Sequence, residues 1–102
     1  MQFVSTRGQA PVLGFSDAVL AGLAADGGLY VPATWPQLER DEIAAFAGKS
    51  YADVAYAIIS RFVDGEIPSQ TLKTIIDEAY ATFRHSSVVP LVELEPNHFV
   101  LE

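Results

Sequence analysis

Residues 22–32 hold the clearest change of local structure in the chain, and they read Gly22-Leu23-Ala24-Ala25-Asp26-Gly27-Gly28-Leu29-Tyr30-Val31-Pro32. A helical pattern of apolar residues runs into this segment, and a short apolar run ended by Pro32 follows the two glycines. Gly27 and Gly28 can take positive φ without a Cβ clash, and Asp26 can accept hydrogen bonds from nearby backbone N–H groups. The segment therefore predicts a helix, a tight turn and a strand over residues 29–31, in that order.

Upstream of this segment, the chain predicts one strand, one loop and one helix. Gln2–Ser5 is short and β-favouring, which predicts a strand, and residues 6–11 contain both Gly and Pro and predict a loop. Over residues 15–23 apolar side chains recur at helical spacing. The inward face that this spacing predicts is Phe15, Val19, Leu20 and Leu23. We expect this helix to end at the glycine pair, residues 27–28.

Three further helical patterns follow the second strand. The acidic start and apolar spacing of residues 38–46 predict a short helix. Ser50, with Asp53 three positions later, predicts the cap of a strongly apolar helix that runs to about Val63, and Pro68 predicts the start of the last helix. The predicted inward faces are Tyr51, Val54, Ala55, Ile58, Ile59 and Phe62 in the first of these two helices, and Leu72, Ile75, Ile76, Ala79, Tyr80 and Phe83 in the second.

A β pattern replaces the helices near the end of the chain. Residues 88–94 and 99–101 predict two strands joined by a turn, and we place a domain boundary near Ser87. The predicted fold class is α+β, with a small β-sheet packed with three to four helices and followed by two further strands.

The charge and composition argue against several classes of protein. The net charge is −7, from six Lys and Arg against thirteen Asp and Glu, so no basic patch is available to bind the phosphate backbone of nucleic acid. No cysteine is present, which removes disulfides and Cys-type zinc sites and fits a reducing compartment. His85 and His98 have no carboxylate at metal-ligand spacing, so no metal site is predicted. No apolar run is long enough to span a bilayer, and no signal-peptide core follows Arg7. We expect a cytoplasmic protein with neither a membrane nor a nucleic-acid partner.

Three motifs together resemble the amino-terminal region of the threonine synthase family. They are residues 22–32, Ser5-Thr6-Arg7-Gly8 upstream and Val89-Pro90-Leu91 downstream, in the family's order and covering nearly the whole chain. The resemblance implies an enzyme of the fold-type II pyridoxal phosphate (PLP) class. Such enzymes convert O-phospho-L-homoserine and water to L-threonine and phosphate.

The same resemblance implies a fragment that ends before the lysine that carries PLP. In the family, the segment similar to residues 99–102 runs into a His-Gly-Pro-Thr stretch and then into the Phe-Lys-Asp motif that holds this lysine. The implied domains are residues 1–87, the amino-terminal domain, and residues 88–102, the truncated opening strands of the PLP-binding catalytic domain. Lys49 and Lys73 lie outside the lysine motif, so we expect no catalytic residue here and no PLP on the fragment alone. The expected partners are the remainder of the same enzyme and its small-molecule substrate, O-phosphohomoserine.

Five residues are candidates for the edge of the substrate cleft, and they are Thr6, Arg7, Asp26, Gly27 and Gly28. Asp26-Gly27-Gly28 has two interpretations: a structural turn, which we favour, and a backbone cradle for an anion. Arg7 lies beside two hydroxyl side chains and suits a phosphate or carboxylate. The interpretation we favour for Arg7 is an ion pair with an acidic residue of the same domain.

Two alternatives to threonine synthase stay open. The first is a threonine-synthase-like phospholyase, which shares this amino-terminal domain and stops after eliminating phosphate, and nothing in the 102 residues separates the two activities. The second is a free-standing interaction domain that buries an exposed strand edge against a partner or a second copy. This second alternative predicts a stable oligomer.

Overall fold

The structural elements follow the predicted order along the chain. The computed structural model describes every residue from Met1 to Glu102. The elements are β1 (Phe3–Ser5), α1 (Phe15–Ala21), β2 (Tyr30–Pro32), α2 (Arg40–Ala44), α3 (Tyr51–Val63), α4 (Ser69–Ala81), β3 (Leu91–Glu95) and β4 (His98–Leu101). The predicted α+β class is confirmed, with four helices and two pairs of strands.

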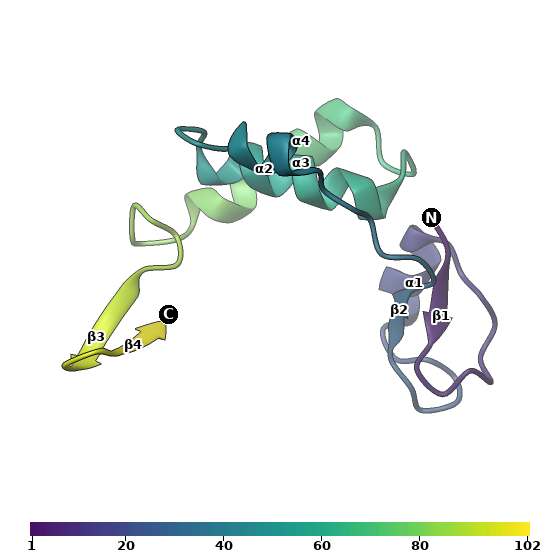
Figure 1. The fold of residues 1–102 in the computed structure, drawn as a ribbon. Helices are drawn as coiled ribbons and strands as arrows, with labels where there is room; N and C mark the ends of the chain where they lie inside the picture. The colour runs from purple at the N-terminus through teal and green to yellow at the C-terminus, as the bar shows by residue number, and fades with distance from the viewer.

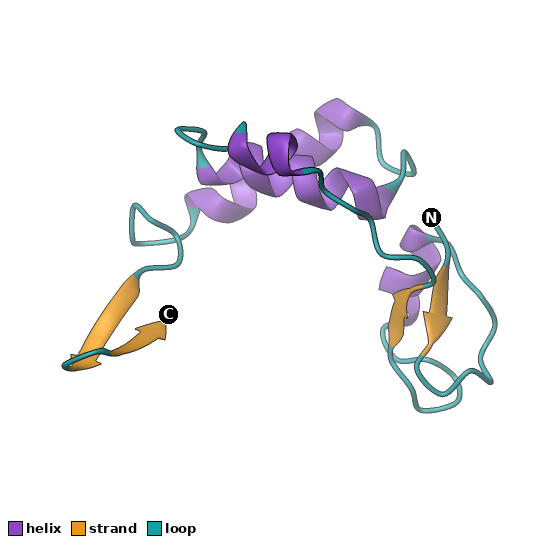
Figure 2. Ribbon diagram, viewed as in Figure 1, coloured by secondary structure: helices purple, strands orange, loops and turns teal.

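The chain forms an open arch. Figures 1 and 2 show helices α2, α3 and α4 across the top, with the β1–β2 pair and α1 at one end and the β3–β4 hairpin at the other. The Cα radius of gyration is 16.6 Å, against about 13 Å for a compact domain of this length. The chain is therefore more extended than a compact domain, and its two pairs of strands form two separate sheets.

The first pair of strands is short and antiparallel. Phe3 lies opposite Pro32, and Ser5 lies opposite Tyr30. Leu13 forms a single antiparallel bridge with Phe3, on the edge of β1 opposite to β2. Proline is tolerated at position 32 because the backbone groups of Phe3 bond to Leu13 instead, and the next bond between the two strands runs from the N–H of Ala33 to the carbonyl of Gln2 at 2.9 Å.

Helix α1 ends sooner than the sequence pattern predicts. Gly22 caps the helix with φ +67°, and its N–H donates to the carbonyl of Ala18. Gly27 and Gly28 lie in the turn that follows, not at the helix end. The prediction that the glycine pair ends the helix is therefore wrong, because Gly22 already supplies the positive φ at which this helix stops.

The buried core is small and lies between α3 and α4. Val63, Leu72 and Ile76 are between 1% and 5% exposed, and Phe15 of α1 packs against them. Several residues predicted to face inward are exposed instead: Val19, Leu20, Leu23, Tyr51, Ile58, Ile75, Ala79 and Phe83. The prediction is wrong at these positions because the chain itself covers only one side of each helix.

Long-range hydrogen bonds also join α1 to the segment between α3 and α4. Glu66, between α3 and α4, accepts hydrogen bonds from the N–H groups of Phe15 at 2.7 Å and Ser16 at 2.8 Å. First-turn N–H groups have no partner inside a helix, so this carboxylate caps α1 and complements its dipole. The N–H group of Ser16 and then that of Phe15 lower the pKa of Glu66. Sequence reasoning missed this cap because fifty residues separate the partners.

Glu66→Ala is expected to speed hydrogen exchange at the amides of Phe15 and Ser16 by about tenfold or more, because both lose a charged acceptor. Exchange measured by NMR in this variant and in Glu78→Ala, a change at an exposed residue of α4, separates loss of the cap from loss of a surface charge. Equal exchange rates in the two variants would contradict the capping role.

Candidate functional site

The carboxylate of Asp26 joins the loop after β1 to the turn before β2. Its Oδ1 accepts hydrogen bonds from Ser5 Oγ at 2.7 Å and from the N–H of Gly28 at 2.9 Å. Its Oδ2 accepts from the N–H groups of Gln9 at 2.9 Å and Ala10 at 3.0 Å. All four donors come from within two short segments, so Asp26 holds both segments in one arrangement.

Thr6 and Arg7 add further contacts between the same two segments. Thr6 donates its N–H to the carbonyl of Leu29 at 2.9 Å, and Thr6 Oγ1 accepts the N–H of Leu29 at 3.0 Å. Arg7 Nη1 donates to the backbone carbonyl of Asp26 at 3.1 Å. The predicted ion pair between Arg7 and an acidic side chain is wrong, because the acceptor is a main-chain oxygen.

The glycine pair forms a structural turn, as the favoured interpretation predicts. The N–H of Gly27 donates to the carbonyl of Ala24 at 2.8 Å, and Gly27 takes φ +78°. The N–H of Gly28 is used by Asp26. The alternative, in which the N–H groups of this turn hold an anion, is therefore not supported, because Gly27 donates to Ala24 and Gly28 donates to the carboxylate of Asp26.

The structure brings all five predicted site residues, Thr6, Arg7, Asp26, Gly27 and Gly28, into one cluster of contacting loops. Sequence reasoning missed the central position of Ser5, which is 6% exposed and bonds to Asp26. The serine hydroxyl in the motif Ser5–Gly8 was the sequence signal that could have indicated this role of Ser5. Gln9 and Ala10 contribute only backbone groups, for which the side chains give no signal.

Hydrogen bonding stabilises the ionised form of Asp26. The Ser5 hydroxyl, followed by the N–H groups of Gly28, Gln9 and Ala10, lowers the pKa of Asp26 from 3.8 to about 2, against an opposing effect of desolvation. Because the folded pKa lies below the unfolded one, the folded state binds fewer protons. This contribution to stability is therefore fully present above the ordinary pKa and is lost as pH falls to about 2.

Asp26→Asn is expected to lower the free energy of unfolding near neutral pH, and this deficit relative to the wild type should shrink as pH falls from the ordinary pKa of 3.8 to about 2. Urea unfolding of both proteins across that range measures the deficit. Asp17→Asn, at an exposed residue of α1, is the control for a lost surface charge. A deficit for Asp26→Asn that stays constant across the range would contradict the role of its charge.

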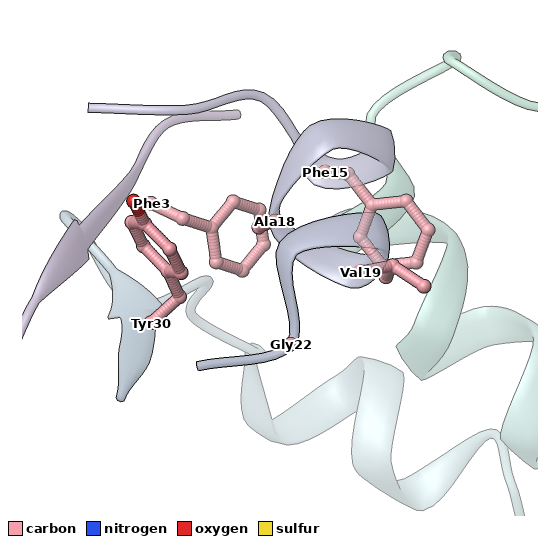
Figure 3. A pocket seen from close by; sticks show the side chains of 6 residues that line it. All are labelled: Phe3, Phe15, Ala18, Val19, Gly22 and Tyr30. Carbon is pink, nitrogen blue, oxygen red and sulfur yellow. The ribbon is translucent and has the colours of Figure 1, made fainter. Parts of the chain in front are cut away.

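An apolar cavity lies beside these loops, between α1 and the β1–β2 pair. Its volume is about 160 Å³, and its lining is Phe3, Phe15, Ala18, Val19, Gly22 and Tyr30. Figure 3 shows Phe3 and Tyr30 on the strand side of the cavity, and Phe15 and Val19 on the helix side. No charged side chain lines the cavity, so we expect it to accept an apolar group.

The structure shows neither a metal-binding cluster nor a helix that could span a membrane. No group of three or more His, Cys, Asp or Glu side chains is placed to hold a metal ion. None of the four helices combines the length and the apolar character that crossing a bilayer requires.

Several named proteins are similar to this chain over its whole length. The threonine synthase of Pseudomonas aeruginosa is 47% identical over 102 residues, which is 100% of this chain and 22% of that protein. A human protein named threonine synthase-like 2 is 39% identical over 103 residues, which is 100% of this chain and 21% of that protein. The chain thus spans about a fifth of the length of these relatives.

Solved structures and a family model agree with these relatives. A PLP-bound threonine synthase from Brucella melitensis has a TM-score of 0.90 at 57% identity, covering 100% of this chain and 22% of that chain. A yeast threonine synthase has a TM-score of 0.81 at 38% identity, covering 91% of this chain and 19% of that chain. Residues 2–80 match the family model described as the threonine synthase N terminus. The chain therefore belongs to the threonine synthase family and corresponds to the amino-terminal part of its members.

Proposed function

We propose that this chain is the amino-terminal part of a PLP-dependent threonine synthase, a carbon–oxygen lyase acting on phosphates. The full-length enzyme would convert O-phospho-L-homoserine and water to L-threonine and phosphate in the cytoplasm. The observation that carries this proposal is the match of residues 2–80 to the family's amino-terminal model. The relatives named threonine synthase support it, because they share the whole length of this chain.

Residues 1–102 do not suit a PLP site by themselves. A PLP enzyme needs a lysine for the Schiff base in a site that also holds the cofactor's phosphate. Lys49 is exposed between α2 and α3, and Lys73 is half exposed, with its Nζ 4.0 Å from Asp53 Oδ1. Neither lysine lines the apolar cavity. We therefore assign the PLP lysine to the remainder of the enzyme and expect the segment alone to be inactive.

We also propose that residues 1–87 are the amino-terminal domain and residues 88–102 are the opening strands of the PLP-binding domain. Strands β3 and β4 pair only with each other, and Leu91, Phe99 and Leu101 are exposed. An isolated two-stranded hairpin is at best marginally stable in water. The hairpin is therefore expected to gain its stability from further strands of the larger domain.

Conversion of O-phospho-L-homoserine by the full-length protein tests the proposed reaction. We expect L-threonine and phosphate in equal amounts from the PLP-loaded full-length protein, and neither product from residues 1–102 alone. Phosphate without threonine would instead favour the phospholyase alternative. No release of phosphate, together with a dimer of the isolated chain that survives dilution to nanomolar concentration, would favour the interaction domain.

We propose that Thr6, Arg7, Asp26, Gly27 and Gly28 line the edge of the substrate cleft in the full-length enzyme. Arg7 is exposed, and the bond from its Nη1 to the carbonyl of Asp26 leaves its other N–H donors available. A guanidinium held in this way suits a phosphate or carboxylate of the substrate, and the two contacting loops give it a fixed position. Arg7 would then bind and orient substrate, with no part in the chemical step.

Arg7→Ala in the full-length enzyme is expected to raise KM for O-phospho-L-homoserine by about tenfold with little change in kcat, because it removes one charge-assisted hydrogen bond. Steady-state kinetics measure this change. Arg84→Ala, at an exposed arginine after α4, is the matched control. Equal KM values for the two variants would exclude Arg7 from substrate binding.

A further inference from the structure

Helix α1 is covered only in part and exposes apolar side chains. Ala18 is 8% exposed and Phe15 packs against the core. Val19 lies one helical turn after Phe15 on the same face and is 63% exposed, and Leu20, further round the helix, is 84% exposed. A helix that turns its aliphatic side chains to water while burying an alanine lacks a partner for those side chains.

Two more exposed leucines follow the end of the helix. Leu23 and Leu29 are 68% and 58% exposed and form an antiparallel bridge. Directly opposed residues in such a bridge have neighbouring side chains. We call these four exposed side chains the α1 surface; they are Val19, Leu20, Leu23 and Leu29.

The apolar cavity adjoins the α1 surface, because Val19 belongs to both. Gly22 forms part of its lining, and no atom lies within 4 Å of the position of an added Cβ there. The cavity of about 160 Å³ (Figure 3) resembles in volume an apolar cavity that accepts a benzene ring. One aliphatic or aromatic side chain can therefore enter it from outside the segment.

The whole chain exposes more surface than a compact protein of its mass. Its accessible surface is 7434 Å², against about 5,600 Å² for a compact monomer of this mass. Large apolar side chains are exposed on the β3–β4 hairpin as well as on the α1 surface, at opposite ends of the arch (Figure 1). One two-fold contact with a second copy through the α1 surface would leave the hairpin uncovered. A large partner that fills the arch covers both.

We propose that the α1 surface and its cavity are a docking face for the larger, PLP-binding part of the same polypeptide, which inserts one apolar side chain into the cavity. This inference rests on the proposed function. The length of the relatives supports this partner, because about four-fifths of each relative lies outside the part that this chain matches. The α1 surface and the apolar side chains of the β3–β4 hairpin also support this partner, because one large domain can contact both.

Photo-cross-linking in the full-length polypeptide tests this docking face. The photoreactive residue p-benzoylphenylalanine replaces Leu20, and in a control protein it replaces Asp77, an exposed polar residue of α4. Light and heavy isotope-labelled copies are mixed before irradiation, so mass spectrometry separates links within one chain from links between copies. We expect position 20 to link to a residue beyond position 102 of the same chain, with a yield well above that of position 77. A link mainly between copies, or no link from position 20, would overturn the proposal.

A second measurement does not depend on the photoreactive residue. In the full-length protein, Leu20→Asp is expected to speed amide hydrogen exchange across α1 by about tenfold relative to Leu20→Met, because a charge cannot be buried in an apolar contact without a partner. Equal exchange in the two variants would overturn the docking face. Neither readout requires activity, so a protein that forms no threonine but gives the expected link keeps the docking face and loses the proposed reaction.

Discussion

Ile76→Ala is expected to lower the free energy of unfolding by about 2–5 kcal/mol, because it removes buried methyl groups and leaves a cavity. Ile76 is 5% exposed and packs in the cluster with Val63 and Leu72 between α3 and α4. Only six hydrophobic residues are buried in the whole chain, so this cluster contributes a large share of the apolar burial. Urea unfolding followed by circular dichroism measures the loss.

The neighbouring isoleucine provides the matched control. Ile75 is in the same helix and is 49% exposed, so Ile75→Ala in the 102-residue chain should change stability by about 0.5 kcal/mol or less. Equal losses for the two variants would contradict the burial that the structure assigns to them. The pair also isolates burial from helix propensity, because the same side chain is replaced at adjacent positions of one helix.

The predicted order of elements is confirmed because it depends on local signals. Ser50 caps α3 by accepting the N–H of Asp53, as the spacing of these two residues predicts. Pro68, predicted as the first residue of the last helix, is the N-cap of α4, so the predicted start differs from the observed start at Ser69 by one position. Such signals act within one turn of the chain, and they can be interpreted without knowledge of the tertiary structure.

The inward faces were predicted less well, because helical spacing identifies an apolar side without saying what covers it. Val19 and Leu20 have the predicted spacing, yet both are exposed. Ile75 lies next to the buried Ile76 and is also exposed. Within this chain only one side of each helix meets another element, and the sequence pattern of the helix does not contain that information.

The candidate site could be located from the sequence, but its internal contacts could not. Asp26 and Arg7 were placed in it by two motifs, and the structure brings these motifs together. Which acceptor Arg7 uses depends on where the carbonyl of Asp26 points, which is a property of backbone geometry. The bond between Ser5 and Asp26 spans twenty-one positions, and no local pattern predicts a pairing at that separation.

Gly28→Ala is expected to destabilise the protein by about 3 kcal/mol, because the added methyl group overpacks a buried site and breaks hydrogen bonds there. A Cβ at Gly28 would lie 2.3 Å from Ser5 Oγ and 3.0 Å from both Asp26 Oδ1 and Thr6 Oγ1. Ser5 is 6% exposed, and its hydroxyl donates to Asp26 and accepts the N–H of Arg7. The hydroxyl therefore cannot move aside without losing bonds. Urea unfolding measures the change.

Two further variants separate this clash from the general cost of replacing a glycine. Gly48→Ala adds a methyl group in open space at φ +75°, so it is expected to cost only about 1 kcal/mol from backbone strain. Ser5→Ala removes the atom nearest the new methyl group. The double variant Ser5→Ala with Gly28→Ala should therefore lose at least about 1 kcal/mol less than the sum of the two single losses. Additive losses would show that the methyl group of alanine at position 28 does not meet Ser5, and the packing described around Asp26 would then be wrong.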